Sequence, residues 1–263
     1  EGRDDRDLPA RGAVLEEFGL AITSLGARAR AAGTSALRRA TNAEDFLDRA
    51  SRAVGVPVEV VSGAAEARLS YRGALSGLGG VTRDDHPIVV DPGGGSTEVY
   101  GGSSALRASL EVGAVRLTEA YLHGDPPRPS EIAALRAHAD AVLEALPPTS
   151  HRPVVAVGGT ATTLAALDAG LDRYDAAAVH GLHLGAARVQ SLGEELASEP
   201  LAVRLRRALL PPGRADIIVA GALLLAALLR RLRADEVIVS DRGLRYGLLE
   251  ELLEGERSGA IRR

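Results

Sequence analysis

The chain has 263 residues, of which 46% are hydrophobic and 25% charged, with a formal net charge of −4. This balance is that of a globular protein of one large or two modest domains, and it excludes a disordered chain, a collagen and a coiled coil. Cysteine is absent, which excludes disulfides, thiolate catalysis and Cys-ligated metal sites.

No apolar run reaches the roughly 18 residues that a membrane span needs, and the charged start is unlike a signal peptide. The cytoplasm is therefore the expected location, with no membrane partner. The acidic balance argues against a sequence-specific nucleic-acid partner. Methionine is absent even at position 1, so we expect the natural start to be missing or trimmed. A polyanionic substrate would need local arginine clusters or a divalent metal.

Helical and strand patterns alternate along the chain, which predicts an α/β fold. In the N-terminal third, the expected elements are a helix over 12–25, a strand over 27–33, a helix from 34, a helix capped by Asn42, a strand over 56–61 and a helix over 64–73. The glycine-rich, charged stretch 77–85 is expected to be a linker.

The remaining two thirds continue the alternation. In chain order, the expected elements are strands over 86–91 and 96–101, helices over 113–123 and 130–146 (the second capped by Ser130), a strand over 154–157, and helices from 158, over 200–210 and over 215–232. A strand over 236–239 and a last helix ending near Glu254 complete the pattern.

The most specific local motif is a glycine turn flanked by two acidic residues. A buried-type strand ends in Asp91, Pro92–Gly95 form a tight turn, and a second strand resumes at Ser96, which predicts a β-hairpin. Glycines let successive backbone N–H groups converge on a phosphate oxygen. Asp91 and Glu98 could hold Mg²⁺ through oxygen ligands. The alternative is a plain glycine-rich turn, but the paired acids favour a functional interpretation. The candidate phosphate-binding residues here are Gly93, Gly94, Gly95, Ser96 and Thr97.

Three further candidates each have an ordinary structural alternative. Gly158, Gly159 and Thr160 form a strand-to-helix turn whose N–H groups could attract an anion, or that simply allows close packing. Glu66, in the first turn of a helix, is more often a structural partner of the helix dipole than a base. Arg38 could bind phosphate through two hydrogen bonds, or lie on a solvated helix face. The histidines show no metal-binding spacing, and His180 and His183 are interpreted as structural.

Taken together, these segments resemble the exopolyphosphatase/guanosine pentaphosphate phosphatase family, of the actin-like fold group. The likeness runs from about Gly12 to Leu253 and rests on six motifs in the same order. The matching segments are 33–42 (GTSALRRATN), 62–69 (SGAAEARL), 91–98 (DPGGGSTE), 158–164 (GGTATTL), 214–216 (RAD) and 240–247 (SDRGLRYG).

The resemblance implies two actin-like (ribonuclease H-like) lobes with a cleft between them, the first lobe incomplete at its N-terminus. It implies lobes of residues 1–76 plus about 243–263, and of residues 82–242. It also implies divalent-metal-dependent (Mg²⁺) release of terminal phosphate from inorganic polyphosphate or guanosine pentaphosphate. By this analogy Glu66 is the general base, Arg38 binds phosphate, and Asp91 and Glu98 serve the metal.

Departures from the family pattern keep two alternatives open. The family's opening hairpin, with its own phosphate loop, is absent, and Ala65 and Tyr246 each stand where the family has an acid. One alternative is a non-catalytic polyphosphate- or nucleotide-binding member. The other is an ATP-dependent kinase of a small metabolite, which shares the fold but would need an aspartate base. A homodimer is left open as a form of assembly.

Overall fold

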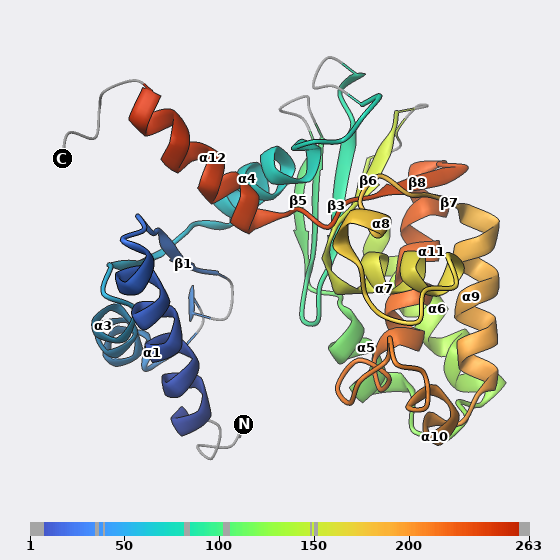
Figure 1. Cartoon of the computed structure of the whole chain (residues 1–263). Coiled ribbons are helices and arrows are strands. Elements are labelled where there is room, and N and C mark those ends of the chain that lie inside the picture. The colour runs from blue at the N-terminus through green and yellow to red at the C-terminus, as the bar shows by residue number, and fades with distance from the viewer. Residues whose placement is uncertain are drawn as a thin grey trace. The chain divides into compact units, whose positions relative to one another are not determined.

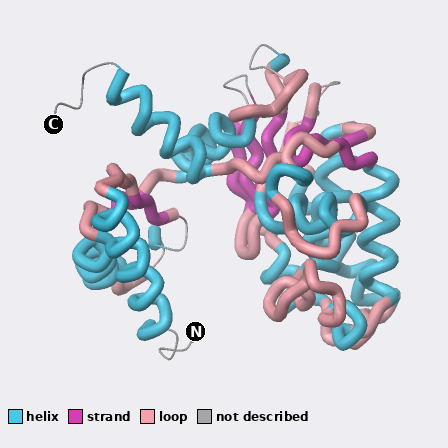
Figure 2. The backbone as a smooth tube through the Cα atoms, viewed as in Figure 1, coloured by secondary structure: helices cyan, strands magenta, loops and turns pink. Residues whose placement is uncertain are grey.

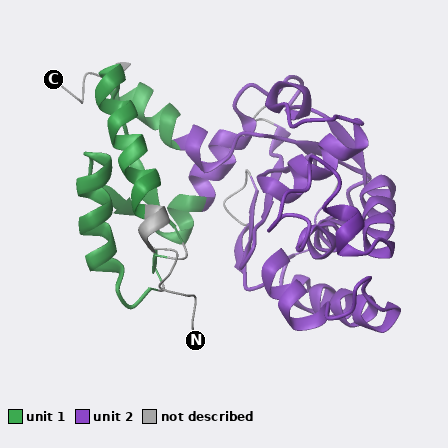
Figure 3. Cartoon of the chain, turned by 60° about the horizontal axis from the view of Figure 1, so that its bottom comes forward, with its two compact units in different colours: residues 1–66, 248–263 green, residues 67–247 purple. Residues whose placement is uncertain are grey.

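The computed structural model describes residues 8–34, 37–38, 40–81, 85–101, 106–147, 149 and 152–257. These residues divide into two compact units, coloured separately in Figure 3. One unit comprises residues 1–66 and 248–263, and the other comprises residues 67–247. The chain passes between the units within two helices, α4 (Gly63–Leu75) and α12 (Leu244–Arg257). The assignment of two actin-like lobes with boundaries near 76 and 243 stays a prediction.

The smaller unit pairs two helices with a short parallel ribbon. Its elements are α1 (Leu8–Leu25), β1 (Ala31–Gly33), α3 (Ala43–Val54) and β2 (Val58–Val60), together with the first residues of α4 and most of α12. Strands β1 and β2 pair in parallel, with Gly33 opposite Val60. Helices α1 and α3 pack against each other. Arg30 ties the ribbon to α12 through an ion pair with Glu251 at 2.7 Å.

The larger unit is built on a six-stranded mixed sheet, drawn in magenta in Figure 2. Its strands are β3 (Ile88–Pro92), β4 (Thr97–Gly101), β5 (Arg107–Leu110), β6 (Val154–Ala156), β7 (His183–Gly185) and β8 (Glu236–Val239). They lie in the order β5-β4-β3-β6-β8-β7. The inner strands β3, β6 and β8 run parallel, whereas β4, β5 and β7 are antiparallel to their neighbours.

Both faces of this sheet are buried, because alternate residues of a strand point to opposite sides. In β3, Ile88 and Val90 belong to the main hydrophobic core, whereas Val89 belongs to a smaller cluster on the other face. Tyr71 and Ala74 of α4 close that second cluster. The unit therefore has helices on both faces of its sheet, as an α/β fold requires.

Helix α11 is the centre of the main core. The remaining helices of this unit are α5 (Ala114–Tyr121), α6 (Pro129–Leu143), α7 (Gly158–Asp168), α8 (Ala176–Val179), α9 (Ala186–Ser198), α10 (Leu201–Arg204) and α11 (Ile218–Leu232). Helix α11 packs against α5, α6, α7 and α9 (Figure 1). Almost every residue of α11 is buried, which explains its nearly uninterrupted apolar sequence.

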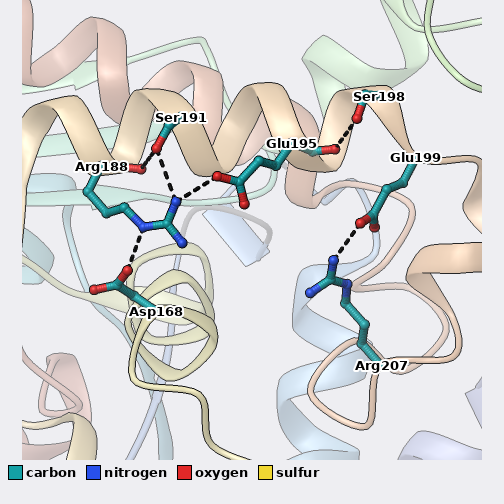
Figure 4. A network of polar contacts seen from close by, with 7 residues as sticks. All are labelled: Asp168, Arg188, Ser191, Glu195, Ser198, Glu199 and Arg207. Carbon is teal, nitrogen blue, oxygen red and sulfur yellow. Dashed lines mark hydrogen bonds and ion pairs between the residues drawn. The ribbon is translucent and has the colours of Figure 1, made fainter.

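Polar contacts tie the solvent side of α9 to its neighbours (Figure 4). The Arg188 guanidinium pairs with Asp168 at 2.6 Å and with Glu195 at 2.7 Å. Arg207 pairs with Glu199 just beyond the helix. The Arg204 side chain, in contrast, is only 4% exposed. It donates to the backbone carbonyls of Leu196, Glu199 and Ala215, so one buried cation joins the end of α9 to the segment before α11.

The expected α/β class is confirmed, and most predicted helices and strands are present, but two predictions were wrong. The helix expected over 200–210 ends at Arg204. Ser130 does not cap α6, because Arg128 occupies the N-cap position and Pro129 is the first helical residue. The prediction that Asn42 is the N-cap residue of α3 is confirmed, although its side chain makes no capping hydrogen bond. The sequence patterns also missed β5, β7, α8 and α9.

The linker expected over 77–85 falls partly outside the described residues, as does much of the helix expected from Thr34. In the described part of the chain, every helix is too short or too polar to cross a bilayer.

Candidate functional site

The hairpin between β3 and β4 forms as the sequence predicts. The two strands pair antiparallel, and Asp91 stands directly opposite Glu98. Residues opposite each other in such a ladder share one face of the sheet, with Cβ atoms about 5 Å apart. The turn is closed by a hydrogen bond of 2.9 Å from the Gly93 N–H to the Ser96 carbonyl. Both carboxylates therefore stand on the same side of a tight glycine turn.

The start of α5 holds this turn in place. The carbonyl oxygens of Gly93 and Gly94 accept hydrogen bonds of 2.9 Å from the N–H groups of Ala114 and Val115. A Cβ at Gly113 would lie 2.5 Å from the Gly94 oxygen, so only glycine permits this approach. The turn's carbonyls are thus directed to α5. That arrangement removes carbonyl oxygens which would otherwise repel a phosphate.

The two hydroxyls of the turn have structural partners. The Thr97 side chain is fully buried, and its hydroxyl donates to the Val112 carbonyl at 2.6 Å. The Ser96 hydroxyl donates to Glu98 Oε1 at 2.7 Å, and Ser109 donates to the same oxygen at 3.1 Å. In this conformation the Thr97 hydroxyl is engaged within the fold, and the assignment of Thr97 to phosphate binding stays a prediction. Ser96 and Ser109 orient the Glu98 carboxylate.

The second glycine turn lies against the first site. Gly158 begins α7 with a φ of +85°, a left-handed conformation that favours glycine. A Cβ there would lie 2.5 Å from Asp91 Oδ1, so the carboxylate of Asp91 packs directly on this turn. Val157, at the N-cap position, makes no side-chain capping bond. The first N–H groups of a helix have no intrahelical partner and attract anions.

Arg214 is a further candidate site residue, with no role expected from the sequence. A Cβ added at Gly159 would overlap the Arg214 guanidinium, which therefore lies on the start of α7. Guanidinium groups recognise phosphate oxygens through paired hydrogen bonds. The segment 214–216 matches one of the six family motifs, which is the signal that could have drawn attention to Arg214.

Thr160 faces the interior rather than the turn's outer surface. It is only 4% exposed, and a Cβ at Gly221 of α11 would lie 2.7 Å from its hydroxyl oxygen. The side chain of Thr160 therefore packs α7 onto α11. Any contribution of this residue to anion binding would come from its backbone N–H.

The smaller unit brings Arg38 and Glu66 together. Arg38 Nη1 donates to Glu66 Oε2 at 2.7 Å and to the Val61 carbonyl at 2.7 Å. Both side chains are partly exposed, at 27% and 14%. Val61 follows β2, and its N–H bonds to the Gly33 carbonyl at the end of β1. The ion pair thus stands at the carboxyl ends of both parallel strands, the edge where ligands bind in such sheets.

The donor set around Asp91 fits a divalent cation that also takes substrate oxygens. Among the described residues, no group of three or more His, Cys, Asp or Glu side chains could hold a metal ion. Mg²⁺, however, is usually bound by one or two carboxylates, water and substrate phosphates rather than by a complete protein cage. Asp91 and Glu98, opposite each other beside two glycine turns, match that requirement.

The larger unit therefore presents a candidate anion site with a carboxylate rim. Asp91, the Gly158–Gly159 turn and Arg214 are contiguous, and the Gly93–Gly95 turn begins two residues after Asp91. An α/β fold with this combination defines a phosphate-handling protein of the nucleotide- or polyphosphate-binding kind.

Comparison with known proteins makes the assignment specific. Residues 3–256 match the model of the Ppx/GppA phosphatase family, and the chain belongs to that family. It is 36% identical over 236 residues to Exopolyphosphatase 2 of Mycobacterium tuberculosis, covering 84% of this chain and 73% of that protein. It is 32% identical over 261 residues to Exopolyphosphatase 1 of Mycobacterium leprae, covering 94% and 74%.

Solved structures agree. The Ppx-GppA enzyme of Aquifex aeolicus is similar with a TM-score of 0.80 and 33% identity, over 94% of this chain and 83% of that one. An exopolyphosphatase from Cytophaga hutchinsonii gives a TM-score of 0.82 at 26% identity, over 96% and 83%. The chain is thus a phosphoanhydride hydrolase with the actin-like fold of this family.

Proposed function

We propose that this chain releases terminal orthophosphate from inorganic polyphosphate, guanosine pentaphosphate or both, in a reaction that depends on Mg²⁺ or another divalent cation. The observation that carries the proposal is the contact of Asp91, the Gly158–Gly159 turn and Arg214. Relatives named exopolyphosphatases at 32–36% identity support polyphosphate as a substrate.

The glycine turns and Arg214 bind and orient the phosphate. The backbone N–H groups of Gly93–Gly95 and of the α7 start offer donors without a Cβ in the way. The Arg214 guanidinium supplies positive charge against Gly159. Asp91 and Glu98 would hold the cation, whose charge would offset that of the phosphate oxygens. Ser96 and Ser109 fix the orientation of Glu98.

Glu66 is the proposed general base. Water attacks the terminal phosphorus and loses a proton to the Glu66 carboxylate. The anhydride P–O bond breaks, and the shortened chain leaves as an oxyanion. The proposal requires this carboxylate to reach the attacking water, since a base acts only within hydrogen-bonding distance. Arg38 pairs with Glu66 at 2.7 Å, and we propose that it also binds the substrate phosphate.

The test is orthophosphate release by the full chain with Mg²⁺ and either long-chain polyphosphate or guanosine pentaphosphate, for the wild type and for Glu66→Gln. Gln keeps the shape of Glu but cannot accept the proton, so turnover should fall about 10²–10⁴-fold with little change in substrate binding. Glu119→Gln is the matched control, because Glu119 is exposed on α5.

Unchanged turnover in Glu66→Gln would refute the assignment of Glu66 as the general base. A wild-type chain that binds both substrates with Mg²⁺ yet releases no orthophosphate would favour the non-catalytic alternative.

A further inference from the structure

The loop between α10 and α11 carries Arg214, and two side chains bind the backbone on either side of that residue. Arg204, the last residue of α10, donates from Nε to the Ala215 carbonyl at 3.1 Å. Asp216 Oδ2 accepts a hydrogen bond of 3.2 Å from the Gly213 N–H. The residue before Arg214 and the residue after it are therefore each held by a side chain.

The backbone of Arg214 is itself fixed within this loop. Its N–H donates to the Pro211 carbonyl at 2.9 Å, and its carbonyl accepts from the N–H groups of Ile217 and Ile218 at 3.2 and 3.0 Å. Ile218 is the first residue of α11 and belongs to the main core. The backbone of Arg214 is thus tied to the core of the larger unit through the start of α11.

The position of this backbone decides where the Arg214 guanidinium lies. That group lies on the start of α7, because a Cβ added at Gly159 would overlap it. A guanidinium binds phosphate oxygens through N–H groups in a fixed planar arrangement, so a shift of the backbone would misalign it. We propose that Arg204 and Asp216 are positioning residues that hold Arg214 against the start of α7 for phosphate binding; this role rests on the proposed function of that site.

Burial makes Arg204 a firm anchor for the loop. Its side chain is only 4% exposed, and its Nη1 also donates to the carbonyls of Leu196 and Glu199 at the end of α9. The guanidinium cannot move with the loop, because these carbonyls would then lose their donor. The hydrogen bond to Ala215 spans eleven positions of the sequence, so it restricts the whole loop that carries Arg214.

The sign of the effect at Asp216 separates positioning from simple electrostatics. Asp216 is exposed and lies two residues after Arg214. Charge alone predicts that removal of this carboxylate strengthens phosphate binding, because two negative groups repel each other. Positioning predicts weaker binding, because the Gly213 N–H loses its acceptor. Asparagine retains an oxygen acceptor at the same place, so Asp216→Asn should preserve the hydrogen bond.

The experiment measures Asp216→Ala, Asp216→Asn and Arg204→Met in the full chain, each alone and combined with Arg214→Gln. Asp175→Ala is the matched control, because Asp175 is also an exposed acid that accepts backbone hydrogen bonds, at the start of α8. The readouts are KM and kcat for polyphosphate with Mg²⁺, the Kd for orthophosphate by titration calorimetry, and Tm.

We expect Asp216→Ala and Arg204→Met each to raise KM and the orthophosphate Kd about fivefold to tenfold, the effect of losing one hydrogen bond. We expect kcat to change little, because Arg214 is proposed to bind substrate and transition state alike. Combined with Arg214→Gln, these substitutions should cause no further loss of affinity, since all act through one guanidinium. Asp216→Asn and Asp175→Ala should bind phosphate as the wild type does.

An unchanged or lower orthophosphate Kd in Asp216→Ala would overturn the proposal, even if Arg204→Met fails to fold. A further loss of affinity in the Arg214→Gln background would also overturn it, because the effect would then not depend on Arg214. The orthophosphate Kd separates this result from failure of the proposed function. A wild-type chain without hydrolysis would refute the function, yet the Kd values of the variants would still decide the positioning role.

Discussion

Gly158→Ala is the substitution for which the structure gives the clearest magnitude. Gly158 has a φ of +85°, where a Cβ costs about 1–2 kcal/mol. The new Cβ would also lie 2.5 Å from Asp91 Oδ1, about 0.9 Å short of the 3.4 Å at which ordinary contact begins. Either the carboxylate or the turn must therefore move by nearly an ångström.

The two effects have different readouts. Backbone strain lowers the free energy of unfolding, which should lower Tm by about 2–4 °C for each kcal/mol in a protein of this size. Displacement of Asp91 by about 1 Å should lower kcat/KM about 10²-fold, because catalytic groups are sensitive to misplacement on that scale. Orthophosphate release and thermal unfolding measure the two effects on the same preparation.

Gly181→Ala separates strain from displacement. Gly181 has a nearly identical φ of +88°, but a Cβ there would meet nothing within 4 Å. It should lose a similar amount of stability and retain activity. Equal loss of activity in both variants, or full activity in Gly158→Ala, would refute the assignment of Asp91 to the site.

Two further predictions concern Arg204 and His180 of the larger unit. Arg204→Met should lower the free energy of unfolding by about 3 kcal/mol in urea denaturation, because three buried or partly buried backbone carbonyls lose their donor. The exposed Arg206→Met should change the free energy of unfolding by less than about 0.5 kcal/mol. Equal losses in the two variants would contradict the argument. Burial lowers the pKa of His180 below its ordinary value of 6.5. The unfolded chain therefore binds the proton more readily, so this residue's effect is to make stability fall as pH drops below about 6.5. Urea midpoints at pH 8 and 5.5 should differ less in His180→Gln than in the wild type, and an unchanged difference would exclude His180 as the cause.

Local patterns predicted those elements whose stability is mainly local or that carry a periodic apolar face. The spacing of apolar residues predicted helices α1, α3 and α6, and a glycine turn between two apolar strands predicted the β3–β4 hairpin. The edge strands β5 and β7 were not predicted, because each is short and its position depends on pairing with a strand elsewhere in the chain. The helix expected over 200–210 stops at Arg204, whose buried guanidinium binds three separate carbonyls, a tertiary arrangement that no local pattern contains.

For the site, residue type and spacing alone predicted the chemistry of the pieces. These pieces are the glycine turns, the acids Asp91 and Glu98, the candidates Arg38 and Glu66, and six ordered motifs that resemble the family. Which atoms meet depends on tertiary packing, which buries the Thr97 and Thr160 side chains and sets Arg214 against Gly159. The physical reason is that residue type and spacing encode conformational preference and reactivity. Contacts between distant segments arise only when the sheet and α11 bury a common core and thereby fix the turns at its edge.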